Sequence, residues 1–259
     1  MLESLYAGAV ADASARQEQV SRSEIEQLVS RAKPALDAVN LLRSGEFVRV
    51  IAEIKRASPS KGHLATINDP ASLAVVYQSA GASAISVLTE QRSFLGSLQD
   101  LDAVRSAVTL PILRKDFIAN EYQVLEARAH GADIVLLIAA GLEPADLIRL
   151  KSLIEELGMT AFIETHNRSE VEFAASIGSK LVGVNARDLS TFETDRELFQ
   201  ELVHLLPTDC IKVAESAVRG EADVKAYASA GADCVLVGEA LVTGDAEALV
   251  GAFSRIPKA

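Results

Sequence analysis

Long apolar runs recur along the chain, each directly after a segment of helical period that ends in glycine. Three of them read SAGASAISVL, AHGADIVLLI and SAGADCVLVG, at residues 79–88, 129–138 and 229–238. A glycine just past a helix provides the left-handed cap, and near-continuous apolar residues are typical of a parallel strand buried on both faces. This repeated order of helix, glycine and strand predicts an α/β fold.

The apolar runs of strand length are spread over the whole chain. We predict strands at residues 48–55, 84–89, 112–117, 133–139, 160–165, 181–185, 212–216 and 234–238. Segments of helical period lie between them, for example at 70–81, 119–131, 143–158 and 219–231. Eight alternations favour a closed (β/α)8 barrel, or TIM barrel, over an open sheet.

The residues before the first predicted strand carry two amphipathic helical stretches, around 2–13 and 23–32. This N-terminal helical extension, residues 1–45, could cap the barrel, cover its mouth or mediate dimerisation, and the pattern does not choose among these. A chain of 259 residues with 49% hydrophobic side chains and no low-complexity linker suits one barrel domain, residues 1–259.

Charge and the N-terminal residues narrow the class of function. A formal net charge of -11 disfavours a nucleic acid partner, because the sequence shows no basic patch to offset it. The start of the chain lacks the basic and apolar regions of a signal peptide, and no apolar run has the length of a membrane span. We expect a cytoplasmic protein that acts on a small molecule, as a monomer or a homodimer.

Cysteine and histidine spacing gives no metal motif. Cys210 and Cys234 form no CxxC pair, and we expect both to be reduced thiols packed near strands. The four histidines, which form no HExxH or comparable cluster, are His63, His130, His166 and His204. We therefore predict no metal site.

Polar side chains gather late in the predicted strands, where functional groups of β/α-barrels collect. Glu53 and Lys55 are two residues apart and so project from the same face of the first strand. The further residues of this kind are Lys115, Glu164, Asn185, Arg187, Glu215 and Ser216. They could be buried ion pairs that tie the barrel together, but their location at successive strand ends favours an active site.

Two of these residues suit proton transfer. Lys115 is the candidate general acid, because a neighbouring cation lowers the pKa of a lysine while carboxylates hold its proton until it is needed. Glu164 is suited to accept a proton from carbon or nitrogen. Phosphate sites in such barrels commonly use the loops after strands seven and eight, where Ser216, Ala217, Gly238 and Glu239 lie.

The segments that carry this chemistry resemble the indole-3-glycerol phosphate synthase family. They are IAEIKRASPSKG, LRKDF, ETH, GVNARDL and VAES, in that order, and the match runs from about residue 41 to the C-terminus. The resemblance implies conversion of 1-(2-carboxyphenylamino)-1-deoxyribulose 5-phosphate, a phosphosugar, to indole-3-glycerol phosphate, with loss of carbon dioxide and water. This is a carboxy-lyase step of tryptophan biosynthesis, and no cofactor or metal is implied.

The resemblance also implies a role for each site residue. Lys115 would be the general acid at the ribulose carbonyl, and Lys55, oriented by Glu53, would bind the substrate and assist dehydration. Glu164 would accept a proton in later steps, while Asn185 and Glu215 position substrate hydroxyls and lysines. The remaining expected substrate contacts are Ser58, Arg187 and Ser216, an apolar wall of Phe94, Phe117, Leu136 and Leu189, and phosphate contacts from Lys55, Ala217, Gly238 and Glu239.

Two positions depart from the family pattern. Ala217 stands where glycine is usual; alanine keeps the backbone N–H but disfavours positive φ, which predicts a strained or altered turn. Leu95 follows Phe94 where a polar residue is common, which puts one substrate hydrogen bond in doubt.

Two other functions fit the same strand pattern. The chain could be another phosphosugar barrel, such as an isomerase of a neighbouring histidine or tryptophan pathway step, although such an isomerase would not need two lysines. It could also be a catalytically silent barrel retained for binding or scaffolding. The complete set of charged residues favours the synthase over both.

Overall fold

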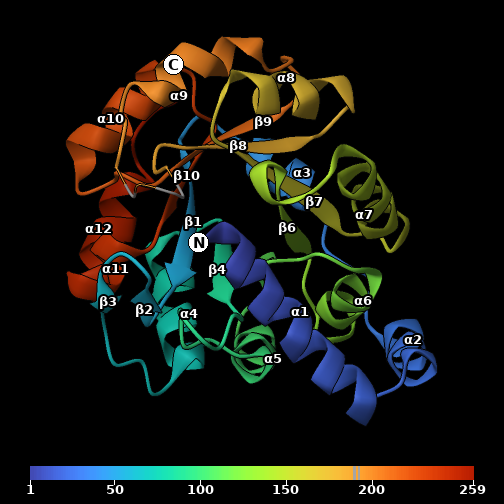
Figure 1. The fold of residues 1–259 in the computed structure, drawn as a ribbon. Helices are drawn as coiled ribbons and strands as arrows, with labels where there is room; N and C mark the ends of the chain where they lie inside the picture. The colour runs from blue at the N-terminus through green and yellow to red at the C-terminus, as the bar shows by residue number, and fades with distance from the viewer. Residues whose placement is uncertain (189–190, 192) are drawn as a thin grey trace.

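Eight parallel strands close into a barrel, as the sequence predicts (Figure 1). The computed structural model describes residues 1–188, 191 and 193–259. The barrel strands are β1 (Arg49–Ile54), β4 (Ala84–Leu88), β5 (Ile112–Lys115), β6 (Ile134–Ile138), β7 (Thr160–Thr165), β8 (Leu181–Asn185), β9 (Ile211–Glu215) and β10 (Cys234–Val237). Strand β1 pairs with both β4 and β10, which closes the ring.

Helices between the strands form the outer layer of the barrel. They are α4 (Pro70–Ala80), α5 (Leu98–Ala107), α6 (Glu121–Ala129), α7 (Pro144–Glu156), α8 (Arg168–Ser176), α9 (Leu198–Leu202), α10 (Glu221–Ser229), α11 (Glu239–Thr243) and α12 (Ala246–Phe253), with short 3-10 turns η1 (Ala139–Gly141) and η2 (Val203–Leu205). In the part of the chain that the structure describes, no helix combines the length and apolar character needed to cross a membrane.

Local signals at the helix ends explain where these helices start and stop. Asp69 caps α4 by accepting a hydrogen bond from Ser72 N–H, and Asn120 caps α6 through a reciprocal pair with Gln123. The three glycines that punctuate the repeated pattern all have positive φ, as expected for left-handed helix caps: Gly81, Gly131 and Gly231.

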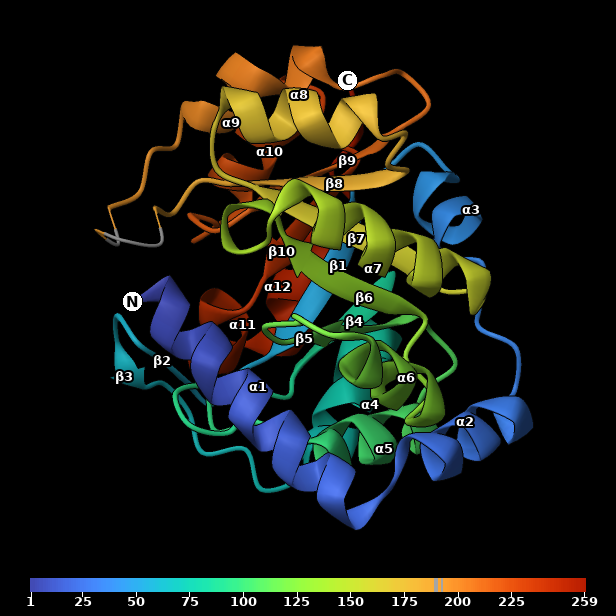
Figure 2. The ribbon, with the colours of Figure 1, turned by 45° about the vertical axis from the view of Figure 1, so that its right-hand side comes forward.

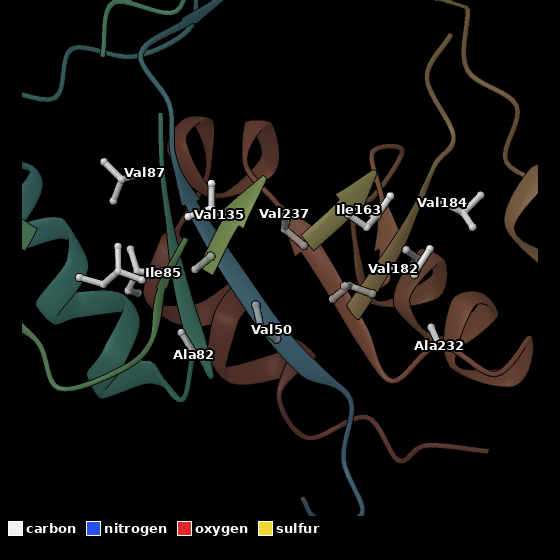
Figure 3. Close-up of a cluster of buried hydrophobic side chains, with 14 of the residues drawn as sticks. Val50, Ala82, Ile85, Val87, Val135, Ile163, Val182, Val184, Ala232 and Val237 are labelled. Atoms are coloured by element: carbon white, nitrogen blue, oxygen red, sulfur yellow. The ribbon is translucent and has the colours of Figure 1, made fainter. Parts of the chain in front are cut away.

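Alternating strand residues divide the core into two parts. Val50, Ile85, Val135 and Ile163 point outward and pack under the helices (Figure 3). The other set points inward and fills the barrel axis with residues such as Ile51, Leu113, Ile134, Phe162 and Leu181. Toward the carboxyl ends of the strands, the inward-pointing residues are charged instead of apolar. The apolar residues below them therefore form the floor of a polar site.

The N-terminal extension covers both ends of the barrel. It folds into α1 (Leu2–Gln19), α2 (Arg22–Arg31) and α3 (Ala38–Arg43). Helix α1 crosses in front of the strands (Figures 1 and 2). Arg16 near its end donates to the Glu126 carboxylate of α6 at 2.5 and 2.9 Å. The buried residues Ala38 and Leu42 of α3 join the inward core near the first residues of β8 and β9. Helix α1 thus lies at the mouth and α3 at the opposite end.

The structure differs from the predicted elements at several boundaries. Helix α1 continues to Gln19, beyond the predicted stretch, and several strands are one or two residues shorter than predicted. Helix α3 and the small antiparallel pair β2 (Ala57–Ser58) and β3 (Gly62–His63) are not predicted. Elements this short contain too few residues for an apolar period to emerge.

Candidate active site

A cavity of about 730 Å³ opens at the carboxyl ends of the barrel strands. Its walls contain every described residue that the sequence predicts for the site: Glu53, Lys55, Ser58, Phe94, Lys115, Phe117, Leu136, Glu164, Asn185, Arg187, Glu215, Ser216, Ala217, Gly238 and Glu239. Leu189, the remaining predicted wall residue, lies outside the described residues. One rim of the barrel therefore gathers the predicted charges.

Lys115 lies at the centre of this group. It is the last residue of β5, and its Nζ atom lies 2.9 Å from Glu164 Oε2 and 3.2 Å from Glu215 Oε2. Both carboxylates belong to other strands, β7 and β9. The barrel thus brings Lys115 together with two carboxyl groups that are 49 and 100 residues away from it in the sequence.

Burial and mutual charge set the protonation states of these three groups. Burial opposes the charge on Lys115, but Glu164, Glu215 and Glu53 outweigh it and raise its pKa above the usual value. Burial also opposes charge on Glu164, yet Lys115 and His166 hold its pKa well below the usual range. Burial together with the charge of Glu164 raises the pKa of Glu215 to about 8. At neutral pH the site holds an ammonium, a carboxylate and a carboxyl group that keeps its proton.

The pKa of Lys115 shifts in the direction opposite to the one predicted from the sequence. The sequence predicts that a neighbouring lysine lowers it, whereas the surrounding carboxylates dominate and raise it. The second lysine, Lys55, has its own partner, since its Nζ lies 2.8 Å from Glu53 Oε1. The ammonium of Lys115 is therefore held in its protonated form.

Two glycines make room for these carboxylates. A Cβ atom on Gly183 of β8 would lie 2.1 Å from Glu215 Oε1, and one on Gly238 would lie 2.4 Å from Glu53 Oε1 and 3.1 Å from Lys55 Nζ. A Cβ at either position would force the neighbouring glutamate side chain to move. Glycine at these positions leaves room for the carboxylates of Glu215 and Glu53.

Glu164 has partners on three sides. Its Oε2 faces Lys115, while its Oε1 accepts a hydrogen bond from Asn185 Nδ2 at 3.0 Å and lies 3.2 Å from His166 Nε2. The sequence places His166 in the ETH segment and in no metal motif, but it is not predicted as a neighbour of this carboxylate. The signal was available, because a residue two positions after Glu164 projects to the same side of an extended segment.

An apolar wall with Phe94 and Phe117 lines the cavity beside the loops after β4 and β5. The ring centroids of Phe94 and Phe117 are 6.1 Å apart, and those of Tyr6 and Phe117 are 5.5 Å apart. Glu90 shapes the loop that carries Phe94 by accepting hydrogen bonds from the N–H groups of Ser93 and Phe94 at 2.7 and 2.8 Å. Such a wall suits a flat aromatic group.

Helix α1 completes this wall with residues that the sequence analysis does not assign to the site. Leu2 and Leu5 line the cavity, and Tyr6 packs behind them on Phe117. Of the roles left open for the N-terminal extension, the structure places α1 over the mouth. The spacing of Leu2 and Leu5 is ordinary for an amphipathic helix, so the sequence does not indicate that they line the cavity.

A further side of the cavity is formed by the loops after β9 and β10. Ser216 Oγ donates a hydrogen bond to Asn185 Oδ1 at 2.7 Å, which ties the first loop to β8. Glu239, at the start of α11, lies 3.3 Å from Lys61 Nζ at the tip of the β2–β3 pair. Arg187 Nη1 also donates to Ser60 Oγ at 3.3 Å, so that pair is held over the cavity from two sides.

Comparison with known proteins identifies the family. The family model for indole-3-glycerol phosphate synthase matches residues 2–252. The chain belongs to the indole-3-glycerol phosphate synthase family. It is accordingly a carboxy-lyase of tryptophan biosynthesis, and the resemblance seen in the sequence is confirmed.

The relatives cover nearly the whole chain. The indole-3-glycerol phosphate synthase of Leifsonia xyli subsp. xyli is 56% identical over 232 residues, which is 90% of this chain and 89% of that protein. Those of Mycolicibacterium gilvum and Mycobacterium tuberculosis are 55% and 54% identical over 233 residues, each covering 90% of this chain and 85% of the relative.

Similar solved structures support the fold alone. A Clostridium perfringens N-acetylmannosamine-6-phosphate 2-epimerase superposes with a TM-score of 0.63 at 16% identity, over 82% of this chain and 93% of that one. A Pyrococcus furiosus thiamine phosphate pyrophosphorylase gives 0.61 at 13% identity, over 84% and 96%. Identities this low leave the function to the side chains of the cavity.

Two positions where this synthase departs from the family pattern both have left-handed backbone. Ala217 has φ of 61° and Leu95 has φ of 57°, so the turns are kept although neither residue is glycine. Leu95 is 48% exposed, and its carbonyl accepts a hydrogen bond from Arg56 Nη1 at 3.1 Å. The backbone of Leu95, rather than its side chain, thus makes the polar contact at that loop.

We expect Ala217→Gly to stabilise the fold slightly. Glycine removes the left-handed penalty of about 1–2 kcal/mol, while its freer unfolded chain opposes this by about 0.4–1 kcal/mol. The matched control is Ala240→Gly in helix α11, which should destabilise by about 0.5–1 kcal/mol. Urea unfolding of both variants measures the effect, and a loss of stability in Ala217→Gly would show that the turn carries no strain.

Proposed function

We propose that this cavity carries out the synthase reaction on 1-(2-carboxyphenylamino)-1-deoxyribulose 5-phosphate with the roles that follow. The supporting observation is the position of Lys115 between Glu164 and Glu215, with an aromatic wall on one side and backbone-lined loops on the other. The aromatic ring of the substrate fits the wall of Phe94, Phe117 and Leu136. Its phosphate fits the backbone N–H groups of Ala217, Gly238 and Glu239.

Ring closure uses the ammonium of Lys115. The ring carbon that bears the carboxylate attacks the ribulose carbonyl, and Lys115 donates a proton to the carbonyl oxygen as the new carbon–carbon bond forms. The bond to the carboxylate then breaks, its electron pair restores the aromatic ring, and carbon dioxide leaves. Lys115 is an ammonium at neutral pH, and its proton moves to the oxygen as the attack turns the carbonyl into a strongly basic alkoxide.

Dehydration uses the remaining groups. The new hydroxyl leaves as water after it takes a proton, with Lys55 assisting, and Glu164 accepts the proton that leaves the adjacent carbon as the indole double bond forms. Glu53 orients Lys55, and Asn185 and Glu215 position the hydroxyls and Lys115. Ser58, Arg187 and Ser216 contact the substrate at the rim.

The decisive experiment supplies the substrate to dialysed, purified protein. Indole fluorescence should grow while carbon dioxide is released in equal amount. Unchanged substrate together with isomerisation of a phosphoribosyl amine would indicate an isomerase instead. Tight substrate binding without turnover would indicate a silent barrel.

The proposal extends to the state of the protein in the cell. Residues 1–259 act as one domain, in the cytoplasm, as a monomer or a homodimer, with no nucleic acid or membrane partner. Its support is the formal net charge of -11 and the two free, buried cysteines. Light scattering of the eluted protein decides between a mass of 27.5 kDa and double that value.

A further inference from the structure

His166 is a buried titratable group that the proposed reaction does not use. It lies directly after β7, and its side chain is 10% exposed. Its Nε2 atom is buried and makes no hydrogen bond with any described residue, yet it stands 3.2 Å from Glu164 Oε1. A buried polar atom without a hydrogen bond calls for a reason.

A second carboxylate holds the other side of the imidazole. Glu170 Oε2 lies 3.4 Å from His166 Nδ1 and accepts the backbone N–H of His166 at 2.8 Å. Glu170 is itself fixed at the start of α8, where Asn167 Nδ2 donates to its other oxygen at 2.5 Å. The ring is therefore placed between two carboxylates, with one of them inside the cavity.

We propose that His166 is a positioning residue: as an imidazolium it keeps Glu164 ionised and fixed toward Lys115, and Glu170 holds the ring in place. This inference rests on the proposed role of Glu164 as proton acceptor. Burial alone opposes the charged form of a histidine, but the two carboxylates raise the pKa of His166 to about 10. A cation at this point offsets the burial of Glu164, whose loss of charge would remove its capacity to accept a proton.

The charge balance around the pair favours this role. The other groups that face it are Lys115 from β5, Glu215 from β9, Glu170 from α8 and Tyr6 from α1, with Asn185 from β8 as a neutral donor. Lys115 also contacts Glu215, so its ammonium is not directed at Glu164 alone. His166 supplies a further positive charge on the opposite oxygen of Glu164.

The pH profile of kcat/KM tests the charge of His166. Glu164 must be ionised to act, so loss of a neighbouring cation raises its pKa and removes activity first at the acidic end. In His166→Gln, which keeps an N–H donor but no charge, kcat/KM at the acidic end should fall about tenfold or more relative to its alkaline value. The control His130→Gln removes a histidine from a carboxylate pair outside the cavity, where Nδ1 lies 2.8 Å from Asp102, and should keep the normal profile. A normal profile in His166→Gln would refute the charge role.

Nuclear magnetic resonance separates this inference from the proposed function. The ring nitrogen signals of His166, followed against pH in the full chain, should titrate at a lower pH in Glu164→Gln than in the unmodified protein. Unaltered titration in Glu164→Gln would overturn the inference, whatever Glu164 does in the reaction. If His166 titrates at a lower pH in Glu164→Gln but turnover stays normal, the proton-acceptor role of Glu164 is overturned and its ion pair with His166 is supported.

Discussion

Lys115→Ala is expected to lower kcat by about 10²–10⁴-fold, because a positioned general acid contributes about that much to the rate. The variant removes the proton donor and also the cation between Glu164 and Glu215, each within 3.2 Å of its Nζ. Loss of this cation also raises the pKa of Glu164, which Lys115 holds low. Single-turnover fluorescence measures the chemical step directly.

A second variant distinguishes the proton from the charge of Lys115. Lys115→Arg keeps a cation, but a guanidinium does not give up its proton at neutral pH, so kcat should stay as low as in Lys115→Ala. Lys225→Ala, at an exposed lysine of α10, serves as the control for loss of a lysine. Near-normal turnover in Lys115→Arg would mean that Lys115 acts through its charge alone.

The three groups at the centre of the cavity differ in their protonation state near neutral pH. The raised pKa of Lys115 keeps it an ammonium at neutral pH, and the lowered pKa of Glu164 keeps it a carboxylate. Of the three, Glu215 is the group whose pKa, about 8, lies closest to neutrality. Opposite shifts in adjacent groups assign the acid and the base to separate residues.

The barrel was predictable because its signal repeats. Each parallel strand is buried on both faces, so its residues form a continuous apolar run, and the glycines after the helices mark the preceding boundary. The charged residues at the strand ends were predictable for the same reason, since Glu53, Lys115 and Glu215 interrupt or end such runs. Once the strands are placed, the closed ring brings those ends together.

Other features required the three-dimensional structure. The position of α1 over the mouth depends on contacts such as Tyr6 with Phe117, between residues far apart in sequence. The pKa of Lys115 depends on how many carboxylates surround it, and the sequence pattern does not give that number. The spacing of His166 from Glu164 indicates a shared side of the segment, but the 3.2 Å approach of Nε2 to Glu164 Oε1 is seen only in the structure.

Glu164→Gln should lower kcat far more than it raises KM. Glutamine keeps the size of the side chain and an oxygen for Lys115 or Asn185, but it accepts no proton from carbon, so the loss should be about 10²–10⁴-fold in turnover. Glu172→Gln, at an exposed glutamate of α8 outside the cavity, is the matched control and should leave both constants unchanged.

The division between kcat and KM decides the role of Glu164. A group that stabilises only the transition state changes kcat and kcat/KM together, whereas a group that binds substrate equally in both states changes KM alone. A variant with normal kcat and raised KM would make Glu164 a binding residue. The neighbouring Glu215 would then be the carboxyl group to test as the proton acceptor. Its pKa is about 8, so its carboxylate, once formed above that pH, is a stronger base than that of Glu164.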